Sequence, residues 1–255
     1  MIARAIAVSC ALLAARAARA DDDEPHVAPC RPTVTCTADL AAPGTLEIEV
    51  GDQLRRGGDQ TSNATPFLVK LPLATWLELQ LGGNGLVYAS GATGSTYVDD
   101  LIAGAKLHLA DQTHLRPSLA VTLAVGVPSS NAPSGAATDL YATAHASKDL
   151  GALHLDANAG LYTYDVSGQT AYQPFVAVAA GYPLSARVTA TLEPHYFARA
   201  GSTAQRDAGA IAAVAFAVRP WCVVDAAIDL VATDPRALEA LAGISLAPAR
   251  LWGGH

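Results

Sequence analysis

The sequence has 255 residues, of which 51% are hydrophobic and 15% charged, and its formal net charge is −7. This composition excludes a disordered chain and requires a large buried or lipid-facing apolar surface. The acidic balance argues against nucleic-acid binding, for which a basic stripe is expected. After the N-terminus no stretch of about 18 apolar residues occurs, which excludes a membrane protein built from helices.

The first twenty residues have the features of a secretory signal. Arg4 supplies a positive charge, residues 6–15 form an apolar core, and residues 18–20 (ARA) form a small-residue cleavage site. An ordinary first helix is the alternative, but the abrupt change to the acidic run at 21–24 favours cleavage. We therefore expect residues 1–20 to be a cleaved signal peptide and the mature protein to be exported.

Residues 21–43 form a proline-containing segment that we expect on the periplasmic side of the protein. Cys30 and Cys36 lie close together in it, and in an oxidising compartment they are candidates for a small-loop disulfide. Zinc binding by the pair is the weaker alternative, because no second cysteine pair completes a site. Cys222 lies in an apolar run and is expected to be a small buried hydrophobe.

From residue 44 onward, apolar and polar residues alternate in successive runs. In residues 114–127, for example, leucines and valines occupy one set of alternate positions, and serine, threonine and glycine lie among the others. Successive side chains of a strand point to opposite faces, so each run predicts a two-faced strand. We expect about twelve strands, at 44–53, 65–72, 75–89, 97–109, 114–127, 138–147, 149–163, 171–182, 185–197, 206–218, 220–231 and 239–251.

The connections between these strands alternate between long and short. Long polar stretches such as 53–65 and 128–137 follow the first and fifth strands, whereas short turns such as 72–74 and 183–184 follow the second and eighth. A transmembrane barrel has this parity because its periplasmic turns are short and its outer loops are longer. The sequence therefore predicts an all-β, up-and-down antiparallel transmembrane β-barrel over residues 44–255.

Charged residues avoid the leucine-rich faces of the predicted strands. A charge on the lipid side costs about 2–4 kcal/mol at the bilayer midplane, so we assign the opposite face to the lumen. Since acids outnumber bases on that face, an open lumen is expected to prefer cations. The candidate pore-lining residues are Glu47, Glu49, Glu78, Lys106, His108, His154, Asp156, Arg187, Glu193, His195, Asp225 and Asp229, and Lys70 and Arg116 fall on the same face.

Aromatic residues gather near the ends of the predicted strands, where the interfacial girdles of a membrane barrel lie. Ordinary core packing at sheet corners is the alternative. The residues concerned are Tyr97, Tyr162, Tyr164, Tyr172, Tyr182, Tyr196, Phe197, Trp221 and Trp252.

Two pairs of imidazole and carboxylate lie two residues apart on the predicted lumen face, His154 with Asp156 and Glu193 with His195. Such pairs can bind a metal or perform acid–base chemistry. No serine, cysteine or threonine stands in a recognisable nucleophile setting, so we expect no enzymatic activity, no metal site and no cofactor. The run at 82–85 (GGNG) precedes no helix, so it predicts a bend in a strand rather than a phosphate site.

Two segments, Arg31 to Gly51 (RPTVTCTADLAAPGTLEIEVG) and Thr65 to Gly85 (TPFLVKLPLATWLELQLGGNG), resemble a known family. This is a family of bacterial outer-membrane transporters linked by name to the MetA pathway of phenol degradation. The similarity covers most clearly the first third of the mature chain and rests on strand and turn residues. The resemblance implies an outer-membrane barrel that passes small molecules, hydrophobic or aromatic ones among them, and it identifies no binding residue.

The sequence thus favours an outer-membrane channel or transporter for the passive passage of small solutes, with outer-membrane lipid around it. An occluded barrel with a structural or ligand-binding role is the alternative, because twelve strands lie between filled eight-stranded barrels and open porins. A soluble exported β-sandwich or lipocalin-like binder is the third interpretation. The solute, the oligomeric state and the exit route are left open.

Overall fold

The computed structural model describes residues 25–90, 94–132, 138–166, 169–199, 207–232 and 236–252. The expected signal peptide, residues 1–20, lies outside the described residues. Within the described ranges, no helix is long and apolar enough to cross a membrane.

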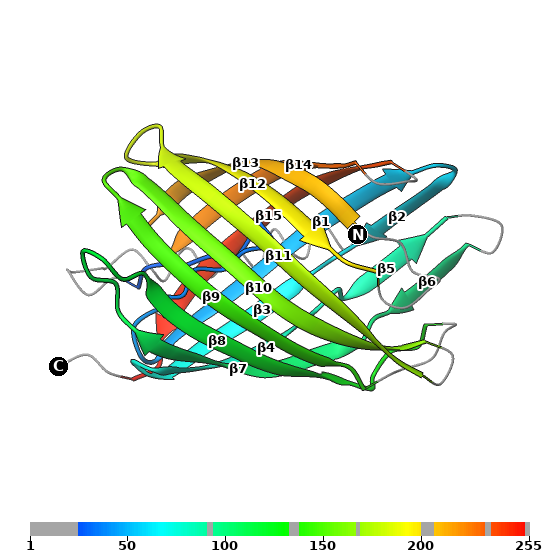
Figure 1. The fold of residues 1–255 in the computed structure, drawn as a ribbon, viewed down its shortest axis with the longest axis horizontal. Helices are drawn as coiled ribbons and strands as arrows, with labels where there is room; N and C mark the ends of the chain where they lie inside the picture. The colour runs from blue at the N-terminus through cyan, green and yellow to red at the C-terminus, as the bar shows by residue number, and fades with distance from the viewer. Residues whose placement is uncertain are drawn as a thin grey trace.

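The strands form one antiparallel sheet that closes into a barrel (Figure 1). Closure comes from β1 and β15, which pair from Thr45↔Arg250 to Gly57↔Ala237. A closed sheet leaves no unpaired edge, as a membrane interior requires. The strands are β1 (Thr45–Gly57), β2 (Gln60–Ala64), β3 (Phe67–Ala74), β4 (Leu77–Gly83), β5 (Leu86–Ala89), β6 (Ser95–Val98), β7 (Leu101–Ala110), β8 (Ser118–Val127), β9 (Leu140–Leu150), β10 (Leu153–Val166), β11 (Gln169–Pro183), β12 (Val188–Phe197), β13 (Asp207–Arg219), β14 (Cys222–Val231) and β15 (Ala237–Arg250).

These fifteen segments make a barrel of 12 strands, because three of its strands are each interrupted once. β2 and β3 both pair with β1, while β5 continues β4 and β6 continues β7. The break between β4 and β5 falls within the glycine run at 82–85, where Gly85 has a φ of +62° that disfavours other residues. The prediction of an up-and-down antiparallel barrel of about twelve strands is confirmed.

The barrel wall is apolar outside and charged inside. In β1, Glu49 is fully buried whereas its neighbour Val50 is 44% exposed, and in β4 the same contrast separates Glu78 from Leu79. Large apolar side chains are exposed on most strands of the wall. A belt of this kind suits contact with lipid chains, and the buried charges face the lumen.

The observed strands differ from the predicted ones mainly at their ends. β1 continues to Gly57 and returns as β2, so most of residues 53–65, expected to be a loop, forms a hairpin. β8 begins at Ser118 and β12 at Val188, which leaves Arg116 and Arg187 in exposed turns instead of on the lumen face. The period of two describes a strand's interior and does not mark where pairing stops.

Residues 25–43 form no strand and run inside the barrel (Figure 1, blue). The sequence predicts a periplasmic segment that precedes the barrel, and the structure places residues 25–43 against the inner wall. The N–H of Val27 donates to the carbonyl of Pro220, in the turn between β13 and β14, at 3.0 Å. The segment then leads into β1 at Thr45. Both of its ends therefore lie at the end of the barrel that carries the short turns.

Candidate functional site

Most of the predicted pore-lining residues do lie on the inner face of the barrel. Eight of these side chains are buried there: Glu47, Glu49, Glu78, Lys106, Glu193, His195, Asp225 and Asp229. His108, His154 and Asp156 are partly exposed near the short-turn end, where His154 contacts Asp149 at 2.6 Å and Asp156 at 3.2 Å. Only Arg187 lies elsewhere among the predicted set.

Two glutamates hold the segment 25–43, which we call the plug. Glu49 accepts hydrogen bonds from the backbone N–H groups of Cys30 and Arg31, both at 3.0 Å. Glu193 accepts from the N–H groups of Val34 (2.7 Å) and Thr35 (2.9 Å) and from the Thr35 hydroxyl. Both carboxylates are fully buried. Hydrogen bonds to a charged group are about twice as strong as those between neutral groups, so these two residues are the strongest anchors of the plug.

Two lysines balance the buried acids and hold plug carbonyls. The Nζ of Lys70 lies 2.9 Å from Glu47 and 2.7 Å from Glu49, and it donates to the carbonyl of Ala28 at 2.6 Å. Lys106 donates to the carbonyl oxygens of Thr37 and Asp39. Buried charges are stable only when they are paired and hydrogen-bonded, and the plug completes that requirement for both lysines.

Arg31 of the plug lies flat against the barrel wall over two glycines. Gly51 and Gly243 are cross-strand partners in β1 and β15, and a Cβ atom on either one would collide with the Arg31 guanidinium. The same guanidinium donates to the carbonyl of Ala242 at 3.1 Å and lies 3.8 Å from Asp225. The two glycines are therefore required for the close approach of Arg31 to the wall.

The structure bonds Cys30 to Cys36, which closes a short loop within the plug. Asn158 of β10 holds this loop through Cys36, accepting from its N–H at 2.8 Å and donating to its carbonyl at 3.0 Å. In the part of the chain that the structure describes, no group of three or more His, Cys, Asp or Glu residues is placed to hold a metal ion.

The plug reaches the barrel wall on several sides. Its partners come from β1 and β3 (Glu49, Lys70), from β7 and β9 (Lys106, Ser147) and from β12 (Glu193). These strands are distributed around the closed sheet rather than gathered on one side. The plug therefore crosses the lumen in the half of the barrel that carries the short turns.

Aromatic rings line one wall of the other half of the lumen, which we call the outer vestibule. The rings of Tyr141, Tyr162, Phe175 and Phe197 form a continuous row across β9 to β12, with successive centroids 5.1, 4.7 and 5.1 Å apart. Tyr162 and Phe197 were predicted to belong to an outward girdle, and that prediction is wrong for both. Tyr172 and Tyr182, in contrast, are more than half exposed on the outer surface.

A cluster of charged residues continues the vestibule beyond this row. Asp207 is the cross-strand partner of Phe197 and lies 3.2 Å from Arg55. Arg55 also pairs with Glu239, while His195 lies 3.5 Å from Asp229. The sequence did not identify Arg55, Asp207 or Glu239, because all three fall at or beyond the predicted strand ends.

Of the two predicted pairs of imidazole and carboxylate, one forms in the structure and the other does not. His154 and Asp156 lie together at the rim of the short-turn end. Glu193 and His195 share the inner face of β12, but Glu193 binds the plug and His195 faces Asp207 and Asp229.

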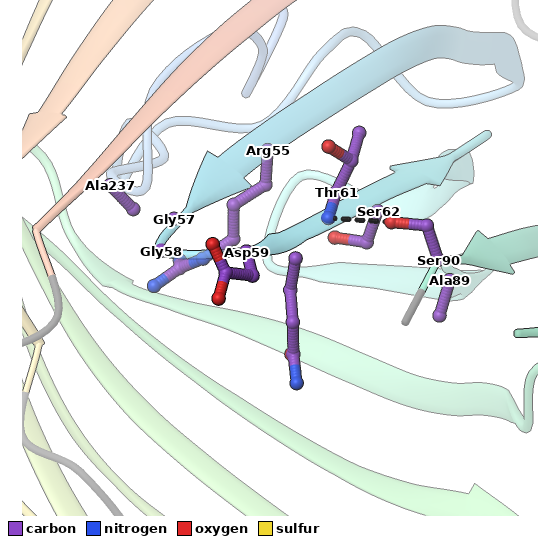
Figure 2. A pocket seen from close by; sticks show the side chains of 10 residues that line it. Arg55, Gly57, Gly58, Asp59, Thr61, Ser62, Ala89, Ser90 and Ala237 are labelled. Carbon is purple, nitrogen blue, oxygen red and sulfur yellow. Dashed lines mark hydrogen bonds between the residues drawn. The ribbon is translucent and has the colours of Figure 1, made fainter. Parts of the chain in front are cut away.

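A polar cavity of about 500 Å³ opens beside the charged cluster (Figure 2). It lies at the β1–β2 hairpin, and Arg55 belongs both to the cluster and to the cavity lining. The N–H of Thr61 donates to the Ser90 hydroxyl at 2.9 Å across it. Its lining residues are Arg55, Gly57, Gly58, Asp59, Gln60, Thr61, Ser62, Ala89, Ser90 and Ala237.

No family model matches this sequence, and no curated protein matches it. Solved outer-membrane proteins share its fold. An outer-membrane channel from Pseudomonas putida F1 is 11% identical, with a TM-score of 0.62 over 89% of this chain and 99% of the other. The NanC porin (9% identity, TM-score 0.56) and the KdgM porin in complex with disordered oligogalacturonate (10%, 0.55) each align with 78% of this chain and 98% of their own. The link to phenol degradation stays a prediction.

Proposed function

We propose that the mature chain is an outer-membrane channel for the passive passage of small solutes, and that the plug closes it. The observation that carries this proposal is a closed barrel whose inner face is charged and whose outer face is an apolar belt. The belt suits a lipid surround, and the charged lumen suits an aqueous path. The solved structures of similar fold are described as a channel and as porins, which supports the same function.

The way the plug is held favours a channel over a permanently occluded barrel. Its anchors are hydrogen bonds and ion pairs to Glu49, Glu193, Lys70 and Lys106. Water can replace such contacts when the plug leaves, so the net cost of release is much smaller than the sum of the individual bonds. A segment held by an apolar core would instead expose that core to water.

The outer vestibule supports small aromatic solutes as the cargo. The row of rings from Tyr141 to Phe197 offers stacking partners along one wall, and stacked or edge-to-face aromatic pairs contribute about 0.5–1.5 kcal/mol beyond area burial. The opposite wall carries the polar cavity at the β1–β2 hairpin. A solute with an aromatic body and a polar group therefore finds partners for both parts.

Single-channel recording in a planar lipid bilayer tests the proposal. The mature chain, residues 21–255, is expected to be closed for most of the time and to show brief, salt-dependent steps. The double variant Glu49→Gln/Glu193→Gln keeps the size of both anchors and removes their charges, so its open time is expected to rise at least about tenfold. Glu239→Gln, which makes the same change at a buried inner-wall glutamate whose hydrogen-bond partners are Gln53 and Arg55, is the matched control. A stably inserted barrel that stays silent in both forms contradicts the channel.

A further inference from the structure

We infer that the outer vestibule contains a binding site for small organic cations with an aromatic body. The site deepens the proposed function and rests on it, because it assigns a ligand class to the open half of the same lumen. Its two components are the ring of Phe197 and the carboxylate of Asp207. These residues are cross-strand partners in β12 and β13, and directly opposed residues have Cβ atoms about 4.5–5.5 Å apart.

The charge balance of the cluster favours a cation. Three carboxylates belong to the cluster: Asp207 and Glu239 both contact Arg55, and Asp207 and Asp229 both face His195. Among the described residues, Arg55 is the one permanent cation in these contacts. The three carboxylates outnumber the cations whether His195 is neutral or protonated, so the group has an excess of negative charge in both cases. A ligand cation inside a protein-lined lumen interacts with such an excess more strongly than in bulk water.

Two buried side chains of the cluster, those of Asp229 and His195, can each make one more hydrogen bond. The Asp229 side chain is only 7% exposed and that of His195 only 3%, and the two lean across Gly209 on the inner wall. Among the described residues, neither Asp229 Oδ1 nor His195 Nδ1 has a hydrogen-bond partner. Buried polar atoms of native proteins are normally paired, so unpaired atoms beside an accessible carboxylate point to a ligand that is bound there.

The rings supply the second half of the recognition. Phe175 is buried over Gly160 and stacks on Phe197 at an interplanar angle of 14°, which holds the Phe197 ring in place. A cation within about 6 Å of a ring centroid is attracted to the ring face. Asp207, with a side chain 27% exposed, is the carboxylate that a solute in the lumen reaches first. The ammonium group therefore lies between the Asp207 carboxylate and the ring of Phe197.

Isothermal titration of the full mature chain in a non-ionic detergent tests this site with three probes of similar size: benzylammonium, benzyl alcohol and benzoate. Saturable binding of the cation is expected, with affinity at least about tenfold above that of the alcohol and with no binding of benzoate. Asp207→Asn is expected to weaken cation binding by about tenfold, and Phe197→Leu by roughly threefold. Asp52→Asn removes the same charge from an exposed residue near the same end of the barrel and is expected to leave binding unchanged.

Equal affinity for the cation and the alcohol, or unchanged binding in Asp207→Asn, overturns the site. Each variant is first checked for the folded barrel by its migration on a gel before and after boiling. The titration needs no ionic current, so it tests the binding site separately from the channel. A barrel that binds the cation but conducts no current supports the binding site and contradicts the channel. A barrel that conducts but binds no probe contradicts the binding site alone.

Discussion

The two halves of the lumen use similar residues in different ways. In the half with the short turns, Glu49, Glu193, Lys70 and Lys106 are all occupied by the plug. In the outer vestibule, the carboxylates of Asp207, Asp229 and Glu239 outnumber Arg55, their permanently charged cation among the described residues. Charged residues on the inner wall therefore do not by themselves show where a solute passes, because those in the short-turn half bind a segment of the same chain.

Crowding the wall beneath Arg31 is expected to have the largest effect on the plugged half. Gly51→Ala with Gly243→Ala places two methyl groups where the guanidinium lies, and overpacking of this kind costs about 1–3 kcal/mol. The plug is then expected to leave its site, which raises the open time in bilayer recordings about tenfold or more. Gly181→Ala is the matched control, because the nearest atom to its added Cβ is 3.6 Å away. An unchanged open time in the double variant means that Arg31 does not hold the plug.

Reduction of the Cys30–Cys36 disulfide is expected to weaken the binding of the plug as well, by less than the two glycine substitutions do. The bond keeps together the backbone N–H groups that Glu49 and Glu193 bind. Closing so short a loop stabilises it by roughly 2 kcal/mol, part of which the anchors retain. A several-fold rise in open time after adding a reductant is the expected result, and the variant Cys30→Ser/Cys36→Ser is expected not to respond. A response in that variant shows that the reductant acts elsewhere.

Gly160→Ala disturbs the outer vestibule without touching the plug. An added methyl group collides with the ring of Phe175, which lies directly over this glycine. We expect a loss of about 1–3 kcal/mol in barrel stability, measured as a lower temperature for the change in gel migration. The open time of the channel in bilayer recordings is expected to equal that of the unsubstituted chain. A change in open time without a loss of stability indicates that the two halves are coupled.

Arg187→Gln gives the smallest expected effect, because Arg187 lies in an exposed turn and not in the lumen. The reversal potential in a salt gradient is expected to equal that of the parent chain. Glu239→Gln, which removes a buried charge from the vestibule, is expected to reduce the preference for cations. A shift of equal size in both variants would mean that Arg187 also faces the lumen, which contradicts its place in the turn before β12.

The alternation of residues was sufficient to predict the barrel and the facing of strand interiors. Glu47, Glu49 and Glu78 are buried opposite exposed leucines and valines, as a period of two requires. The same alternation places Tyr162 and Phe197 on the inner face. The expectation of an aromatic girdle assigned both residues to the outer face, which is wrong. Arg187 was misplaced because periodicity does not locate the first paired residue of a strand.

The plug could not be predicted from the sequence. Residues 25–43 have no period, and their main contacts are made by backbone N–H and carbonyl groups, which every residue carries. The partners lie far apart in the chain, such as Thr35 and Glu193. Two signals were available, namely the close cysteines and the paired glycines Gly51 and Gly243, and only the structure shows that both serve one segment.

Hydrogen–deuterium exchange of the plug amides tests the central claim most directly, namely that residues 25–43 are a removable part of a channel. We predict that the amides of Cys30, Arg31, Val34 and Thr35 exchange together and faster than those of the surrounding strands. We further predict that Glu49→Gln/Glu193→Gln raises only the plug rates, by about tenfold or more. Plug amides that exchange no faster than the barrel wall in both proteins would contradict the claim, since the plug would then be a fixed part of the fold.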